Sequence, residues 1–209
     1  MERNNSGQML LSILGVAILV VAVVGVSFAF FTYTGEGKTD NTITTGTLVF
    51  AYSDADAAGN GVTISNAIPM TDLAGKDLTG AGNVFAFNVT ATATGANIAY
   101  EVIAKKVDSA PNELPGDAVR ILLKHGTTNA AVTTEAPLTL DATKVRDYTS
   151  LGADSKGTGK LLFSDTITAG TASYAKYFEL RMWLGEVAMG PAYNGKTFKI
   201  RINVEAKNA

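Results

Sequence analysis

The stretch FKIRINVE, residues 198–205, decides the fold because apolar and polar side chains alternate along its whole length. A period of two is typical of a β-strand that has one face in a core and the other in water. The core face would hold Phe198, Ile200, Ile202 and Val204. The water face would hold Lys199, Arg201, Asn203 and Glu205.

The segments around this strand extend the same pattern. Asn194-Gly195, just before it, predicts a tight turn, and YFELRMWL at residues 177–184 alternates in the same way, so the two segments are expected in one antiparallel region. Six further candidate strands are residues 47–53, 61–65, 84–93, 98–107, 118–124 and 160–168. Together they predict an all-β protein, a jelly-roll-like β-sandwich closed by its last strand.

One helix is expected inside this β-rich region. Residues 141–151 begin with an aspartate suited to capping, and Gly152 follows them, so the segment predicts a short helix. No internal repeat and no second domain boundary is visible.

Composition excludes several classes of chemistry. Cysteine is absent and His125 is the single histidine, which rules out disulfides, thiol nucleophiles and Cys/His zinc clusters. The formal charge of -2 arises from residues scattered without long runs, so nucleic acid is not an expected partner. No combination of nucleophile, base and orienting group is evident, and we therefore predict neither an enzyme nor a cofactor.

The N-terminal region predicts export. Residues 9–31 are apolar apart from two serines and are long enough to cross a membrane as a helix. They follow a polar start and contain Ser27-Phe28-Ala29, a small-x-small pattern, so we expect signal peptidase to cleave between Ala29 and Phe30. A retained anchor is the first alternative, because the apolar run is long. A prepilin-like leader ending at Gly7-Gln8 is the second.

These features divide the chain into three parts. Residues 1–29 would be a signal peptide or membrane anchor, 30–46 an N-terminal arm and spacer, and 47–209 the folded domain.

Both ends of the folded region resemble one family. The apolar segment ending in Ser27-Phe28-Ala29, followed by Phe30-Phe31 and by NTITTGTL at residues 41–48, looks like the TasA/camelysin family of Gram-positive surface proteins. FELRMWL at 178–184 and YNGKTFKI at 193–200 are similar to the last two core strands of that family. The resemblance implies export, a jelly roll, and matrix fibres in which each subunit's N-terminal strand completes its neighbour's sheet.

Physical argument independently supports such an arm. Phe30, Phe31 and Tyr33 form a short β-prone peptide, and the nearby Gly35 and Gly37 would let it leave its own domain. A sheet edge with unpaired backbone groups accepts such a peptide, and head-to-tail donation produces a filament. Two alternatives remain at this stage: the arm is the membrane-proximal end of the helix, or it folds back as the first strand of its own sheet.

Five other positions carry candidate roles. Asp54 and Asp56 fit the first positions of a calcium loop but lack the later oxygen ligands, which makes them a weak metal site. His125 is interpreted as a turn residue. Trp183 shares a strand face with Arg181, opposite the core residues, so the two are candidates for a subunit interface, with loop cover from the same domain as the alternative.

The leading functional hypothesis is a secreted structural subunit that self-associates into an extracellular or biofilm-matrix fibre at the cell surface. A membrane-anchored binding module and a viral or phage structural protein are the alternatives, because a fold does not fix a function.

Amino-terminal sequencing of the secreted protein tests the export prediction. We expect it to begin at Phe30, because signal peptidase accepts the small residues Ser27 and Ala29. A start at Gln8 would instead identify the prepilin-like leader, and a start at Met1 a retained anchor.

Overall fold

The structure is a computed structural model that describes residues 33–36, 41–45, 48–54, 62–65, 67–79, 84–107, 112–136, 138 and 144–209, the first three ranges by backbone alone. These residues belong to one compact unit, Tyr33–Ala209. This unit includes part of the expected arm and spacer, residues 30–46, and the boundary at residue 47 stays a prediction. The expected export segment 9–31, including Ala29, Phe30 and Phe31, lies outside the described residues.

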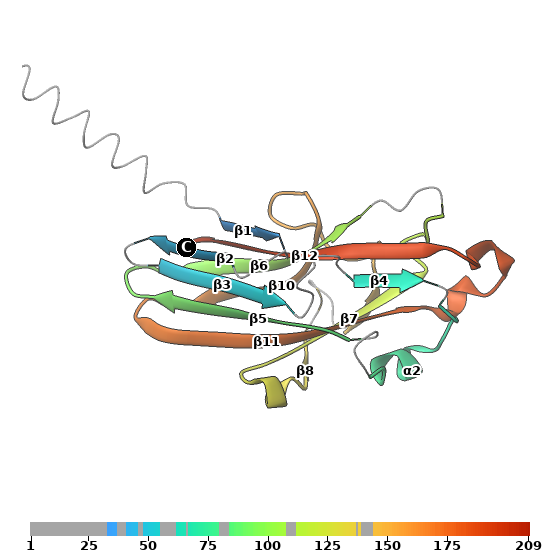
Figure 1. Ribbon diagram of the computed structural model, residues 1–209, viewed down its shortest axis with the longest axis horizontal. Helices are drawn as coiled ribbons and strands as arrows, with labels where there is room; N and C mark the ends of the chain where they lie inside the picture. The colour runs from blue at the N-terminus through green and yellow to red at the C-terminus, as the bar shows by residue number, and fades with distance from the viewer. Residues whose placement is uncertain are drawn as a thin grey trace, which may run out of the picture. The chain divides into compact units, whose positions relative to one another are not determined.

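Antiparallel strands make up most of the unit (Figure 1). The strands are β1 Tyr33–Glu36, β2 Asn41–Thr45, β3 Leu48–Asp54, β4 Val62–Ser65, β5 Val84–Ala93, β6 Ile98–Lys106, β7 Val119–Gly126, β8 Thr134–Glu135, β9 Val145–Asp147, β10 Lys160–Ile167, β11 Thr171–Leu184 and β12 Thr197–Asn208. The helical segments are α2 Asp72–Lys76 and the 3-10 turns η1 Asn129–Ala131, η2 Glu186–Ala188 and η3 Pro191–Tyr193. The all-β prediction is confirmed, and each of the eight predicted strands is present.

Two sheets contain these strands. In the first, the order is β1-β12-β6-β10, and β4 also pairs with β12. In the second, the order is β2-β3-β5-β11-β7-β8, and β9 also pairs with β7. From β3 to β7, and again from β10 to β12, each strand lies in the other sheet from the strand before it. The chain thus crosses repeatedly from one sheet to the other.

Both sheets contribute side chains to one core. Phe163 of β10 and Phe178 of β11 lie in different sheets, and their ring centroids are 5.2 Å apart. The four apolar residues of the last strand, Phe198, Ile200, Ile202 and Val204, are all buried in the same cluster. The alternation in FKIRINVE therefore predicted its core face correctly. The turn at Asn194-Gly195 is also confirmed, with Gly195 at a φ of 69°.

The helix expected at residues 141–151 is wrong for its described part, residues 144–151. β9 occupies Val145–Asp147 and pairs with β7, and a turn follows it. The carboxylate of Asp147 accepts hydrogen bonds from the backbone N–H and the hydroxyl of Ser150, at 2.8 and 2.7 Å. Asp147, with a serine three residues later, therefore closes a turn at the end of β9. Asp141 lies outside the described residues.

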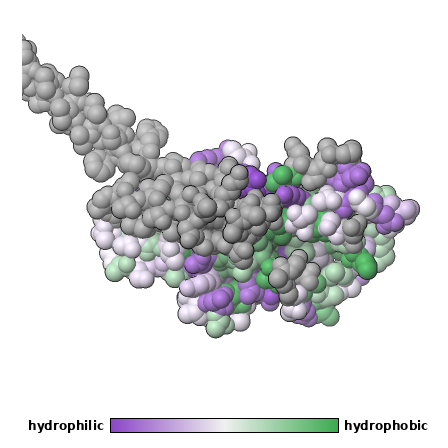
Figure 2. Space-filling view, in the orientation of Figure 1, coloured by the Kyte–Doolittle hydropathy of each residue, from purple (hydrophilic) through white to green (hydrophobic). Residues whose placement is uncertain are grey.

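Several large apolar side chains lie on the surface. Ile68, Leu73, Val187 and Met189 are each more than two-thirds exposed. They come from two neighbouring segments, because Met70 forms a parallel bridge with Gly185 and its N–H donates to the carbonyl of Leu184 at 2.9 Å. Figure 2 shows hydrophobic surface at the end of the molecule where Figure 1 draws α2 and the loop after β11. We call these four residues the apolar end patch.

A polar cluster joins β10 to β11 beside the core. Lys176 Nζ donates to Asp165 Oδ2 at 2.5 Å, and the hydroxyl of Tyr174 donates to the same oxygen at 3.0 Å. His125 lies in β7 rather than in a turn, with its ring centroid 5.1 Å from that of Phe163. Burial, together with the charge of Lys176, lowers the pKa of His125, and the charge of Asp165 opposes this.

The single histidine makes this environment measurable by NMR titration. We expect the pKa of His125 to lie below its ordinary value of 6.5 in the folded protein. The folded state then binds fewer protons than the unfolded state, so stability should fall as the pH drops from about 6.5 through the folded-state pKa. Lys176→Gln should raise the pKa of His125, and Lys124→Gln is the control. A pKa unchanged by Lys176→Gln would contradict the assigned cause.

Candidate functional site

The edge of β12 that faces away from β6 is shared by two strands. β4 pairs with Thr197–Ile200, and β1 pairs with the stretch from Asn203 to Ala206. The opposite edge of β12 pairs continuously with β6 from Ile200 to Asn208. β1, only four residues long, thus fills the part of the edge that β4 leaves open. We call residues 203–206 of β12 the acceptor segment.

The acceptor segment is buried on both faces. Val204 and Ala206 lie in the core, as alternation requires. Asn203 and Glu205 point the other way, yet they are only 0% and 6% exposed. The prediction that this face lies in water therefore holds in part for Lys199 and Arg201, which are partly buried, and is wrong for Asn203 and Glu205.

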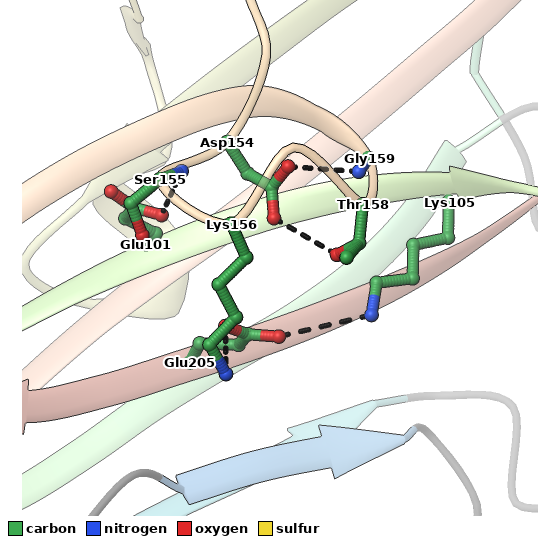
Figure 3. A network of polar contacts seen from close by, with 8 residues as sticks. All are labelled: Glu101, Lys105, Asp154, Ser155, Lys156, Thr158, Gly159 and Glu205. Carbon is green, nitrogen blue, oxygen red and sulfur yellow. Dashed lines mark hydrogen bonds and ion pairs between the residues drawn. The ribbon is translucent and has the colours of Figure 1, made fainter.

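The cause is a loop that contacts this outer face of the sheet. Lys156 lies in the turn between Asp154 and Gly159, and its Nζ is 2.8 Å from Glu205 Oε2 (Figure 3). From β6, Lys105 Nζ approaches the other carboxylate oxygen at 3.7 Å. Two lysines therefore neutralise a carboxylate that would otherwise be costly to bury.

The same loop relieves a repulsion between two strands. Glu205 stands directly opposite Glu101 of β6 in the strand register, and like charges in such pairs are destabilising. The backbone N–H of Ser155 donates to Glu101 Oε2 at 3.0 Å, so each carboxylate has a partner from the loop (Figure 3). The acceptor segment is held by β6 and this loop as well as by β1.

Asp154 fixes the shape of the loop. Its carboxylate accepts hydrogen bonds from the backbone N–H of Gly159 at 2.8 Å and from the hydroxyl of Thr158 at 3.0 Å. Burial alone would raise the pKa of Asp154, but these hydrogen bonds outweigh it and hold the pKa below its ordinary value. The loop geometry is therefore retained at neutral pH, where the carboxylate is charged.

The structure describes only part of the expected N-terminal arm. Tyr33 begins β1 and lies opposite Ala206, while Phe30 and Phe31 are outside the described residues. In this single chain, β1 pairs with β12 of its own sheet, which is the fold-back alternative stated for the arm. The pairing also identifies which edge accepts this peptide.

Trp183 and Arg181, the candidate interface residues, are both buried by their own chain. Trp183 is 1% exposed and packs with Leu122 and Val145. The Nε of Arg181 donates to the carbonyl of Leu78 at 3.0 Å. This is the arrangement of the loop-cover alternative, and it leaves neither side chain available to a second subunit.

The helix α2 is the central element of the segment that covers Trp183. Arg120 of β7 makes a two-point hydrogen-bonded ion pair with Asp72 in the first turn, at 3.0 and 2.6 Å, which lowers the pKa of Asp72. Gly75 packs so closely on the indole that an added Cβ would stand 2.2 Å from a ring carbon of Trp183. The hydroxyl of Thr71 caps the helix by accepting from the N–H of Ala74. A helix of five residues is thus fixed by tertiary contacts.

Two further expectations from the sequence are a weak metal site at Asp54 and Asp56 and a helix that crosses a membrane. Within the described part of the chain, no group of three or more acidic, histidine or cysteine side chains could hold a metal ion. Asp54 ends β3, where only the backbone is described, and Asp56 lies outside. The described ranges contain no helix long and apolar enough to span a membrane.

Comparison with known proteins gives no family assignment. No protein-family model matches the chain, and no curated protein is similar to it at the level of sequence.

The contact between Gly75 and Trp183 can be tested through the single tryptophan. We expect Gly75→Ala to lower the free energy of unfolding by about 1–3 kcal/mol, because the added methyl group overpacks the indole. Tryptophan fluorescence should also shift to longer wavelength as the helix is displaced. Ala74→Ser, an exposed change in the same helix, is the control. An unchanged stability and spectrum in Gly75→Ala would contradict the packing.

Proposed function

We propose that the protein is a secreted structural subunit of an extracellular or biofilm-matrix fibre, in which β1 of one copy pairs with the acceptor segment of the next. The observation that carries this proposal is the division of the β12 edge between β4 and β1. One four-residue peptide fills its part of the edge, while the strand that receives it is held by other elements. Exchange of an identical element between copies is a low-cost route to assembly.

Two features support the exchange. Backbone pairing gives β1 its place on the sheet, and a neighbour's β1 has the same sequence and can form the same four residue pairs. The contacts of Lys105 and Lys156 with Glu205 involve no residue of β1. The acceptor segment can therefore keep its shape while β1 leaves and another β1 enters.

We infer further that the fold is a jelly roll. The orders β4-β12-β6-β10 and β5-β11-β7-β8 provide two sets of four strands. The step from β7 to β8 stays within one sheet, and every other step between successive strands of the eight changes sheet. Eight strands in two sheets with this pattern are typical of a jelly roll. β1, β2 and β3 are additions to that set: β2 and β3 extend the second sheet beyond β5, and β1 continues the edge that begins with β4.

The extracellular location rests on the sequence of the N-terminal region. Residues 9–31 would hold the chain in the membrane during export, and cleavage between Ala29 and Phe30 by signal peptidase would release it. Release would leave Phe30, Phe31 and Tyr33 at the free end of the arm. The partners in this proposal are signal peptidase, the membrane and further copies of the chain.

A second function is favoured by one specific observation. Because β1 pairs within its own chain, a monomeric domain held at the cell surface by an uncleaved anchor has a complete edge and no need for a neighbour. Such a protein would act as a binding module. The two functions differ in whether β1 ever pairs between copies.

Mixed cysteine variants distinguish them, since the natural chain has no cysteine. Glu36 and Asn203 are opposite each other in the β1–β12 register, so Glu36→Cys in one copy and Asn203→Cys in another can form a disulfide only after exchange. We expect the mixed, secreted proteins to give disulfide-linked heterodimers under mild oxidation and fibres in electron microscopy.

The matched control places the second cysteine at Lys199. Lys199 lies on the same face of β12 but pairs with β4, so Glu36→Cys mixed with Lys199→Cys should give no disulfide above background. Persistent monomers, with equal cross-linking in the test and the control, would exclude strand exchange and favour the binding module.

A further inference from the structure

The apolar end patch is held on a rigid base. Leu73 is 75% exposed, although its neighbours in α2 are fixed by the Asp72–Arg120 ion pair and by the contact between Gly75 and Trp183. Val187 lies in η2, where the N–H of Gly185 donates to the carbonyl of Ala118 at 2.9 Å. Little conformational entropy would therefore be lost when a partner covers these side chains.

The direction of β1 indicates what would cover them. Tyr33 lies opposite Ala206 and Glu36 opposite Asn203, so the C-terminal end of β1 points along β12 towards Thr197. In a strand supplied by a second copy, the chain continues in that direction to the start of its own domain. The body of the donor copy is therefore directed to the end of the acceptor where β4 and α2 lie.

Chain length sets how far away the donor lies. Its β2 begins at Asn41, five residues after Glu36, and an extended chain spans about 3.3 Å per residue, or about 17 Å in all. From Asn203 to Thr197 is six residues of strand, about 20 Å. Ser65, at the end of β4, pairs with Thr197, and Ile68 follows three residues later. A donor chain that continues in the direction of β1 would therefore place the start of its domain on the Thr197 side of the acceptor segment, the side towards which β4 and Ile68 lie.

The free energy of fibre assembly depends on contacts between the two copies. The β1–β12 pairs are the same in a closed monomer and in an exchanged fibre, so exchange alone provides no net gain to offset the entropy lost on association. Contacts that exist between copies, and not within one, would supply such a gain. A standard interface buries about 800 Å² per partner, from about 20–30 residues a side, so four side chains would contribute to a contact that the exchanged strand also holds.

We propose that the apolar end patch, Ile68, Leu73, Val187 and Met189, binds the donor domain of a second copy of this chain and shifts the equilibrium from self-paired monomer to exchanged fibre. The inference rests on the proposed function, because it assigns a role to the patch only once β1 is exchanged. It names a surface that the strand pairing itself does not include.

The test compares two doubly substituted proteins that add the same charge. Leu73→Asp with Val187→Asp places two carboxylates in the patch. Thr127→Asp with Ala130→Asp places two on the exposed turn at η1, which follows the other end of β7 from Arg120. We expect the critical concentration for fibre growth to rise about tenfold or more in the patch variant, and to stay within about twofold of the natural protein in the control.

Monomer stability is the first check on both proteins. All four substituted residues are exposed, so the melting temperature of the monomer should not change. If Leu73→Asp with Val187→Asp unfolds, the milder pair Leu73→Ser with Val187→Ser replaces it, with a smaller increase in critical concentration expected.

Failure of the inference and failure of the proposed function are distinguishable. The inference would be overturned by a folded patch variant that forms fibres at the same critical concentration as the natural protein. A natural protein that forms no fibres and no Glu36–Asn203 heterodimer would overturn the proposed function itself. A natural protein that stays monomeric and binds a different partner of the cell surface through the patch would also overturn both.

Discussion

Backbone pairing along one edge of β12 is the constraint on which the rest of the structure depends. The core face of this strand joins the two sheets, its inner edge pairs with β6, and its outer edge is divided between β4 and β1. Every unpaired N–H or carbonyl group on a buried strand is costly, so the segment beside β4 requires a partner. The chain meets that requirement with β1, and this makes the peptide at Tyr33–Glu36 part of the fold.

The sequence predicted the strands well and the surroundings of one strand badly. Alternation placed Phe198 and Val204 in the core because period two depends only on local geometry. It also placed Glu205 in water, since alternation carries no information about what covers the outer face of a sheet. That cover comes from Lys156, 49 residues earlier in the chain. The sequence left two interpretations of Trp183 open for the same reason, because α2, which covers it, lies more than a hundred residues before it.

The arm shows where local reasoning reaches its limit. The residues around Tyr33 predict a β-prone peptide, but they cannot say whether its partner is the same chain or another. The identity of the accepting edge could not be read from the sequence either, because β1 and β12 are at opposite ends of the chain. The sequence does contain one signal for the accepting edge: the charges of Glu205, Lys105 and Lys156. These three residues are far apart in the chain, so their pairing is evident only in the folded structure.

The self-paired monomer is the competitor of any fibre, so assembly depends on how readily β1 opens. Opening breaks only four residue pairs at an edge, a small local unfolding that leaves the core side chains of β12 packed. Lys105 and Lys156 keep Glu205 in place meanwhile, so the vacated edge stays extended and ready for a strand. Re-closing of β1 within one chain competes with exchange, so a high local concentration of copies favours exchange. Under the proposed export, release of many copies from one membrane surface would supply that concentration.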